Sequence, residues 1–167
     1  MDMYSASIPV FERMLASMQA WLGQARVYAQ SRGFDESVYL GLRLAPDMLP
    51  LSRQVQIASD AAKAGVARLA GETPPSWPDE EASLGELLLR LQRTREFIAA
   101  VPAAALVGSE AREVRVPRRQ GEALQFKGED FLRFYALPNF YFHATTLYAL
   151  LRHAGVPLGK LDYLGTR

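Results

Sequence analysis

The strongest constraint on the fold is a run of apolar residues near the start of the chain, spaced three and four positions apart. The run consists of Ile8, Phe11, Leu15, Met18, Leu22, Ala25 and Ala29. Because an α-helix turns once every 3.6 residues, this spacing places them all on one face. The pattern predicts a long amphipathic helix that ends at Gly33 and packs its apolar face against other helices.

Two further stretches show helical spacing. A second helix is expected to start at a capping Asp47, to keep Pro50 in its first turn and to end near Leu69. A third is expected after the proline-rich stretch 72–81, where Ser83 and Glu86 fit a capping box. In that motif each side chain satisfies a backbone amide at the start of the helix.

After the third helix the period changes from helical to alternating. Val114 and Val116 alternate with charged residues, and so do Leu124 and Phe126, across a turn that contains Gly121. The pattern predicts a small β-hairpin. A two-stranded hairpin is marginal in water on its own, so we expect it to lie against the helices or to pair with another chain.

The last helical region is expected from near Asp130 to Ala154, with an interruption at Pro138. The basic side chains Arg115, Arg118, Arg119 and Lys127 cluster on the hairpin. They are interpreted either as a solvated edge that discourages strand aggregation or as an anion contact. The predicted fold is all-α: four long helices, with the hairpin inserted before the last, in a single domain over residues 1–167.

Composition excludes several classes of function. Nineteen Lys and Arg against eighteen Asp and Glu leave a net charge of +1, too little to predict nucleic-acid binding. The chain has no cysteine, which excludes disulfides and thiolate chemistry. No stretch approaches the roughly 18 consecutive apolar residues of a membrane span, and residues 1–7 carry no basic cluster ahead of an apolar core. We expect a cytoplasmic protein with no membrane contact.

Several motifs carry a resemblance to a known family. The densest are LPNFYFHATT at 137–146 and LLRHAGV at 150–156. Further matches are LAPDM at 44–48, QVQ with ASD within 54–60, and LGKLDYLG at 158–165. With these motifs the chain resembles the domain-of-unknown-function family "nineteen ninety-three" of the DinB/YfiT-like superfamily. The resemblance implies a four-helix bundle of the kind that is often dimeric in this superfamily.

The resemblance also implies a metal site from which this chain departs. Better-studied members of the superfamily use three histidines to hold a divalent metal, one on the second helix and two on the last. This chain has only two histidines, so such a site cannot form. His143 and His153 are separated by a helical rise of about 15 Å, far more than the reach of two bonds of about 2 Å to one ion. A structural role at the helix end is expected for His153.

His143 falls on the same apolar stripe as Phe140 and Leu147, so it should face the interior of the bundle. The candidate pocket consists of His143, Asn139, Gln54, Asp60 and Tyr141. In the simpler interpretation His143 is a core histidine that is hydrogen-bonded to Gln54, Asp60 or Tyr141. In the other it is a surviving ligand of zinc or nickel, or a general base, with Asn139, Gln54 or Asp60 supplying oxygens.

The aromatic residues near the start of the last helix occupy more than one helical face. They are Phe131, Phe134, Tyr135, Phe140, Tyr141, Phe142 and Tyr148. This surplus predicts core packing plus a dimer interface, with the wall of an apolar ligand pocket as the alternative.

No phosphate-binding loop, nucleophile elbow or dinucleotide fingerprint is present in the sequence. The sequence therefore favours a homodimeric small-molecule-binding or structural module with a degenerate metal site and no cofactor. The alternative is a divalent-metal-dependent transferase or hydrolase that uses His143.

Overall fold

The computed structural model describes residues 2–118 and 120–166. Arg119, which the sequence placed in the basic cluster of the hairpin, lies outside the described residues. The four long helices are α1 (Met3–Arg32), α2 (Leu51–Leu69), α3 (Leu84–Ala99) and α5 (Leu137–His153). The shorter helical elements are η1 (Glu36–Tyr39), η2 (Ala103–Leu106), η3 (Ser109–Ala111), α4 (Gly128–Phe131), the π-helical η4 (Leu132–Ala136) and α6 (Lys160–Leu164).

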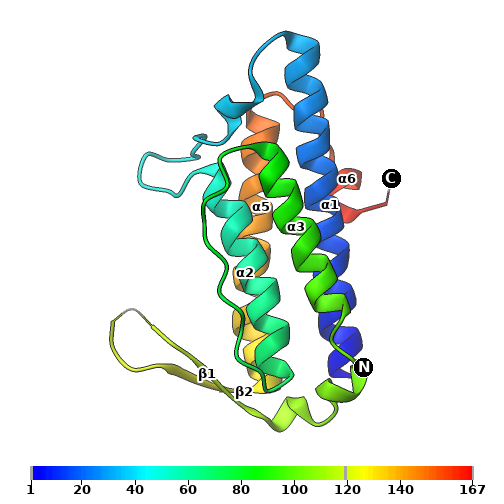
Figure 1. Ribbon diagram of the computed structural model, residues 1–167, viewed down its shortest axis with the longest axis vertical. Coiled ribbons are helices and arrows are strands. Elements are labelled where there is room, and N and C mark those ends of the chain that lie inside the picture. Colours follow the sequence, from blue (N-terminus) through cyan, green and yellow to red (C-terminus); the bar gives the residue numbers. More distant parts are fainter. Residues whose placement is uncertain (1, 119, 167) are drawn as a thin grey trace.

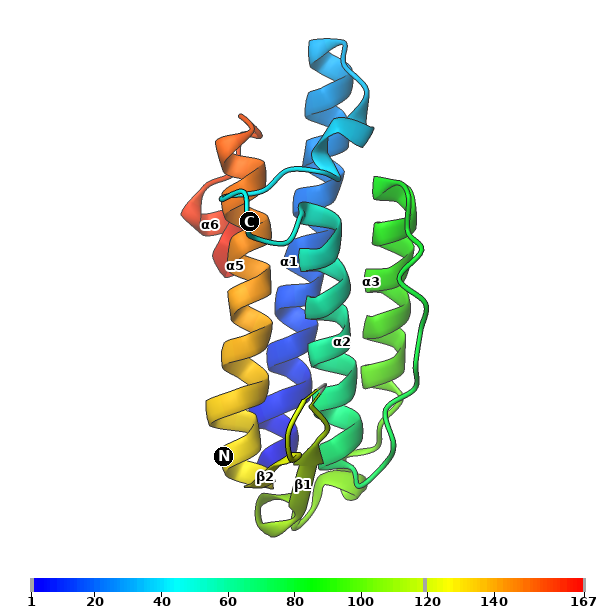
Figure 2. The ribbon, with the colours of Figure 1, turned by 90° about the vertical axis from the view of Figure 1, so that its left-hand side faces the viewer.

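The four long helices form a bundle in which α1 and α5 run in one direction and α2 and α3 in the other (Figures 1 and 2). Because α2 and α3 are parallel, the chain between them has to return along the length of the bundle. Residues 70–83 make this return as an extended segment, which we call the strap. The arrangement pairs α2 with α5 on one side and with α3 on the other.

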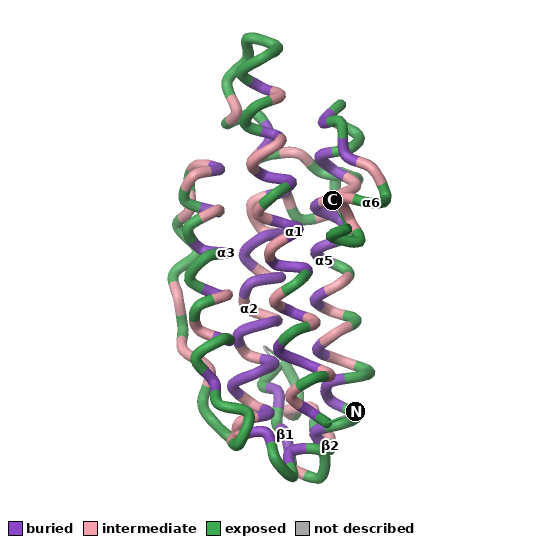
Figure 3. Tube along the Cα trace, turned by 90° about the vertical axis from the view of Figure 1, so that its right-hand side faces the viewer, coloured by how far each residue is buried: buried purple, intermediate pink, exposed green. Residues whose placement is uncertain are grey.

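Buried residues line the inward sides of the long helices and form one hydrophobic cluster (Figure 3). The predicted stripe of α1 is confirmed, because every member from Ile8 to Ala29 is buried. The helix begins earlier than the stripe, at Met3, where the Asp2 side chain accepts a hydrogen bond from the Ser5 amide. It ends as predicted at Gly33, which has a φ of 72°. No helix within the described residues is long and apolar enough to cross a membrane.

The predicted cap of α2 is wrong. Asp47 lies in a turn, and α2 begins at Leu51 with Pro50 as its N-cap, one position before the helix rather than inside its first turn. The preceding loop takes over the capping, because the amide of Leu51 donates to the carbonyl of Leu42 at 2.9 Å. A backbone oxygen brought in by the fold therefore replaces a side-chain cap, which local sequence does not reveal.

Half of the predicted capping box of α3 is confirmed. The hydroxyl of Ser83 accepts from the Glu86 amide at 3.1 Å. The Glu86 carboxylate accepts instead from the amide of Ala82 at 2.6 Å, one residue before the expected donor.

The hairpin is confirmed, with β1 (Glu113–Val116) antiparallel to β2 (Leu124–Lys127) and Val114 opposite Phe126. Val114 and Val116 are buried, so the hairpin lies against the helical bundle as expected. Arg115 and Arg118 are exposed.

The interruption predicted at Pro138 takes the form of a π-helical turn, η4, directly before it. Proline has no amide hydrogen to donate, and its ring clashes with the carbonyl four residues earlier. A widened turn relieves that clash without breaking the helix. The segment therefore continues as one rod from α4 into α5, with Pro138 in the first turn of α5.

Gly128, where β2 meets α4, tests how tightly the hairpin is joined to the bundle. A Cβ atom at this position would lie 1.9 Å from the carbonyl oxygen of Ser109, a backbone atom that cannot easily move. We expect Gly128→Ala to lower the free energy of unfolding by about 1–3 kcal/mol or more. Chemical denaturation monitored by circular dichroism measures this change.

Gly23 is the matched control, since a Cβ atom there, within α1, would meet nothing within 4 Å. Gly23→Ala should raise the free energy of unfolding by about 0.5–1 kcal/mol, because alanine restricts the unfolded chain and favours the helix. Equal effects of the two substitutions would contradict the close contact at Gly128.

Candidate functional site

The contact between α2 and α5, which we call the seam, contains the histidine that the sequence singled out. His143 is buried, with 8% of its surface exposed. Its Nδ1 atom lies 2.7 Å from Oε1 of Gln54. The two helices run antiparallel (Figure 2), and Gln54 in the first turn of α2 meets His143 in the second turn of α5.

The hydrogen bonds of Gln54 define which nitrogen of His143 carries the proton. The Gln54 Nε2 atom donates to the carbonyl of Leu49 at 2.8 Å, so its Oε1 atom is the acceptor for the ring. His143 therefore donates through Nδ1–H, and its Nε2 atom keeps a lone pair. Burial lowers the pKa of His143 below its ordinary value, so the ring is neutral at pH 7.

A pocket of about 220 Å³ opens further along the same seam, on the side of the π-helical turn. From α2 it is lined by Asp60, Ala61, Ala64, Gly65 and Arg68. From the opposite side it is lined by Phe131, Tyr135 and Asn139, with Val116 of the hairpin at its edge. Two predicted site residues, Asp60 and Asn139, therefore share this pocket, one turn or more away from the hydrogen bond between His143 and Gln54.

Tyr141, the fifth predicted residue, lies elsewhere. It lines a hollow between α1 and α6 together with Arg13 and Tyr163. Burial raises the pKa of the Tyr141 phenol, Tyr163 raises it further, and Arg13 acts in the opposite direction. The predicted residues are thus divided among the hydrogen-bonded pair, the seam pocket and this separate hollow.

The described part of the seam contains few side chains of the kind that bind a metal ion. His153 is exposed at the end of α5, away from His143. Within residues 2–118 and 120–166, no group of three or more His, Asp or Glu side chains is placed to hold a metal ion. The carboxamide of Gln54, which stands across from His143, uses its two polar atoms in the hydrogen bonds described above.

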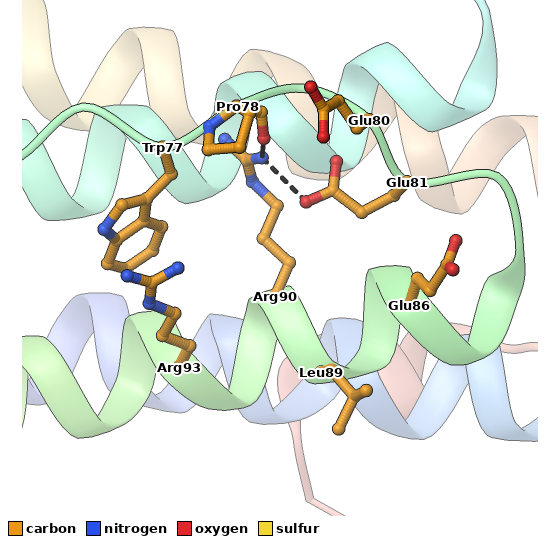
Figure 4. Close-up of a pocket in the computed structure, with 8 residues that line it drawn as sticks. All are labelled: Trp77, Pro78, Glu80, Glu81, Glu86, Leu89, Arg90 and Arg93. Atoms are coloured by element: carbon orange, nitrogen blue, oxygen red, sulfur yellow. Dashed lines mark hydrogen bonds and ion pairs between the residues drawn. The ribbon is translucent and has the colours of Figure 1, made fainter.

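A second polar cluster lies between α2, α3 and the strap (Figure 4). Its centre is Arg90, whose side chain is only 2% exposed. The guanidinium donates to Glu81 at 2.8 Å, to the carbonyl of Pro78 at 2.9 Å and to Asp60 at 3.1 Å. Asp79 also lies 3.0 Å from it. Arg90 therefore ties the strap to both parallel helices.

Three further charged residues of this cluster, Glu81, Lys63 and Arg93, also have partners. Burial alone would raise the pKa of Glu81, but hydrogen bonds from Arg90 and Gln56 outweigh it and hold the pKa below its usual value. Trp77 of the strap has the Lys63 ammonium 4.0 Å and the Arg93 guanidinium 4.2 Å from its ring centre. The adjoining cleft of about 390 Å³ is thus lined mainly by groups that already serve to hold the strap.

A larger hollow of about 730 Å³ lies at the end of the bundle near the start of α1. Most of its charged groups have partners, since Asp2 caps α1 and Glu129 pairs with Arg133 at 2.9 Å, and Glu110 is the remaining charged residue of its lining. The hollow therefore contains little uncommitted polar chemistry to orient a ligand.

Arg68 and Arg90 are the functional candidates that the sequence did not single out. Arg90 interrupts the buried stripe of α3 between Leu87 and Leu91, a signal that was available in the sequence. Arg68 stands in the last turn of α2, where a basic residue is ordinarily explained by the helix dipole. Arg68 lines a pocket only because the segment from α4 to α5 packs opposite α2.

The arrangement of the four helices with one crossing strap is that of a DinB-type bundle, and a solved structure supports this class. A DinB family member from Shewanella denitrificans superposes with a TM-score of 0.90 at 40% sequence identity. The match covers 98% of this chain and 92% of that one. No curated protein matches this chain. Residues 3–164 match the family described as domain of unknown function (DUF1993), and the chain belongs to that family.

The hydrogen bond between His143 and Gln54 predicts a single ring tautomer. We expect long-range proton–nitrogen NMR spectra to show His143 protonated at Nδ1 and to show its ring titrating below about pH 6.5. Because the folded pKa is lowered, the free energy of unfolding should decrease as the pH falls from about 6.5 toward that folded pKa.

Gln54→Leu removes the acceptor at nearly the same volume and should give a mixture of tautomers. A ring protonated at Nε2 in the unaltered protein would contradict this assignment.

Proposed function

We propose that this protein binds a small organic molecule in the seam pocket and that it does so without a catalytic metal. The supporting observation is that both polar atoms of the Gln54 carboxamide already make hydrogen bonds. Its Oε1 atom accepts from His143, and its Nε2 atom donates to the Leu49 carbonyl. The pocket beside this pair combines an apolar wall with a few polar groups, the composition typical of ligand sites.

The metal-independent part of the proposal follows from ligand chemistry. Divalent zinc or nickel needs several nitrogen, sulfur or carboxylate ligands held at fixed positions. In the hydrogen-bonded pair, the Nε2 atom of His143 is the one nitrogen with an uncommitted lone pair. Asn139 would bring a neutral amide oxygen, which adds little to the affinity for such an ion.

A fragment screen followed by proton–nitrogen correlation NMR tests the proposal. We expect ligands to shift the backbone amides of Ala61, Gly65 and Asn139, and we expect the shifts to persist in the presence of EDTA. Ala61→Leu should weaken the binding at least about tenfold, because the added atoms occupy a pocket of only about 220 Å³.

Ala20→Leu, at an exposed position of α1, is the matched control and should leave the affinity unchanged. The metal-dependent alternative makes the opposite prediction. Stoichiometric zinc, nickel or manganese in protein purified without added metal, lost in His143→Ala, would overturn the proposal in favour of a metal-dependent transferase or hydrolase.

We further propose that the protein acts as a homodimer through the outward side of η4 and α5. Two large aromatic side chains there, Phe134 and Phe142, are 66% and 56% exposed. Exposed aromatic rings of this size are typical of protein interfaces.

Static light scattering at micromolar concentration is expected to give twice the mass of the chain. The double substitution of Phe134 and Phe142 to serine should give a monomer, because it removes the apolar area of the contact. Leu89→Ser is the control, since Leu89 is 69% exposed on α3, and it should leave the dimer intact. A monomeric unaltered protein would contradict this assembly.

A further inference from the structure

Arg68 differs from the other cations that are partly or fully buried in this bundle. Lys63 and Arg90 are 3% and 2% exposed in their side chains, and each is paired with Asp60. Arg68 is partly buried, yet within the described residues its guanidinium has no hydrogen bond or ion pair. Burial lowers the pKa of its guanidinium, with only the Tyr135 hydroxyl acting in the opposite direction.

Asp60 cannot supply the missing partner. It lies eight residues before Arg68 on α2, a rise of about 12 Å along the helix axis. Its carboxylate already accepts from Lys63 at 2.7 Å and from Arg90 at 3.1 Å. Because two cations neutralise it, Asp60 also repels an anion in the pocket less than an isolated carboxylate would.

The walls around Arg68 are suited to a flat apolar group. Ala61, Ala64 and Gly65 present small side chains on the α2 side of the pocket. On the other side, the rings of Phe131 and Tyr135 stack with centroids 5.9 Å apart. A volume of about 220 Å³ is below the roughly 300–1,000 Å³ of sites for drug-sized ligands, so the occupant has to be small.

We propose that the seam pocket takes a small aromatic carboxylate, whose carboxylate group pairs with the guanidinium of Arg68 while its ring lies between the small side chains of α2 and the Phe131–Tyr135 wall. The inference rests on the proposed function, which supplies the pocket, and adds the chemical class of the ligand. A guanidinium matches a carboxylate through two parallel hydrogen bonds, which an ammonium group cannot reproduce.

The far end of the pocket adds a second preference. Asp60, about two turns of α2 before Arg68, and Asn139 of α5 line this end, and both offer oxygen atoms that accept hydrogen bonds. A ligand with a hydroxyl group opposite its carboxylate could donate to one of them. The pocket should therefore favour 4-hydroxybenzoate over benzoate.

NMR titration with benzoate, 4-hydroxybenzoate and the neutral benzamide tests this inference. Both carboxylates should shift the amides of Ala61, Ala64 and Gly65, and benzamide should bind at least about tenfold more weakly. Arg68→Gln should weaken carboxylate binding by about 10- to 100-fold, while Arg68→Lys should fall between it and the unaltered protein.

Arg93→Gln is the matched control, because Arg93 is an exposed arginine on α3 outside the seam, and it should not change the affinity. Arg68→Gln should keep its thermal midpoint, since no hydrogen bond or ion pair of the described structure is lost. A folded Arg68→Gln variant that binds the carboxylates as well as the unaltered protein does would overturn the inference.

Two other outcomes separate this inference from the proposed function. Equal binding of benzamide and benzoate in the pocket would overturn the role of Arg68 and leave small-molecule binding supported. Seam amides that respond to neither carboxylate would overturn the ligand class, whereas the proposed function is decided independently by the fragment screen.

Discussion

The buried guanidinium of Arg90 is the interaction on which the rest of the structure depends. Two parallel helices cannot be joined by a short turn, so α2 and α3 require the strap, and a proline-rich strap has few backbone hydrogen bonds of its own. Arg90 holds the strap in place through its contacts with Glu81, Asp79 and the Pro78 carbonyl. α3 and the strap cover one side of α2. α5 therefore packs against the opposite side of α2, and this contact is the seam.

The same network shapes the chemistry of the seam. Asp60 is held by Lys63 and Arg90, and Arg68, at the far end of the pocket, has no acidic partner among the described residues. At the other end of the seam, Gln54 holds His143 as a neutral donor. The seam thus holds a single imidazole whose Nδ1–H is satisfied by a side-chain amide. The polar groups of the seam are suited to orienting an organic ligand.

Local sequence predicted the elements well where one physical signal dominated. The stripe from Ile8 to Ala29 gave α1, and the alternation around Val114 and Leu124 gave the hairpin. It failed at the start of α2, where the amide of Leu51 finds a carbonyl from the folded loop. For the site, the sequence predicted that His143 faces inward, because the helical period fixes the face of each residue. It also named Gln54 among the expected hydrogen-bond partners of His143. Tyr141 was grouped with them although it faces a different neighbour.

By itself the sequence determined that the chain forms helices with one strand pair, that it lacks the histidines for a three-nitrogen metal site, and that His143 turns inward. These properties follow from residue identity and from periods of 3.6 and 2 along the chain. The tertiary structure alone decided that Asp60 pairs with Arg90 and that Tyr141 lies outside the seam pocket. It also decided that the Arg68 guanidinium lines this pocket with no ion pair among the described residues. Such pairings depend on which helices are neighbours and in which direction they run, and the period of a single helix carries no information about either.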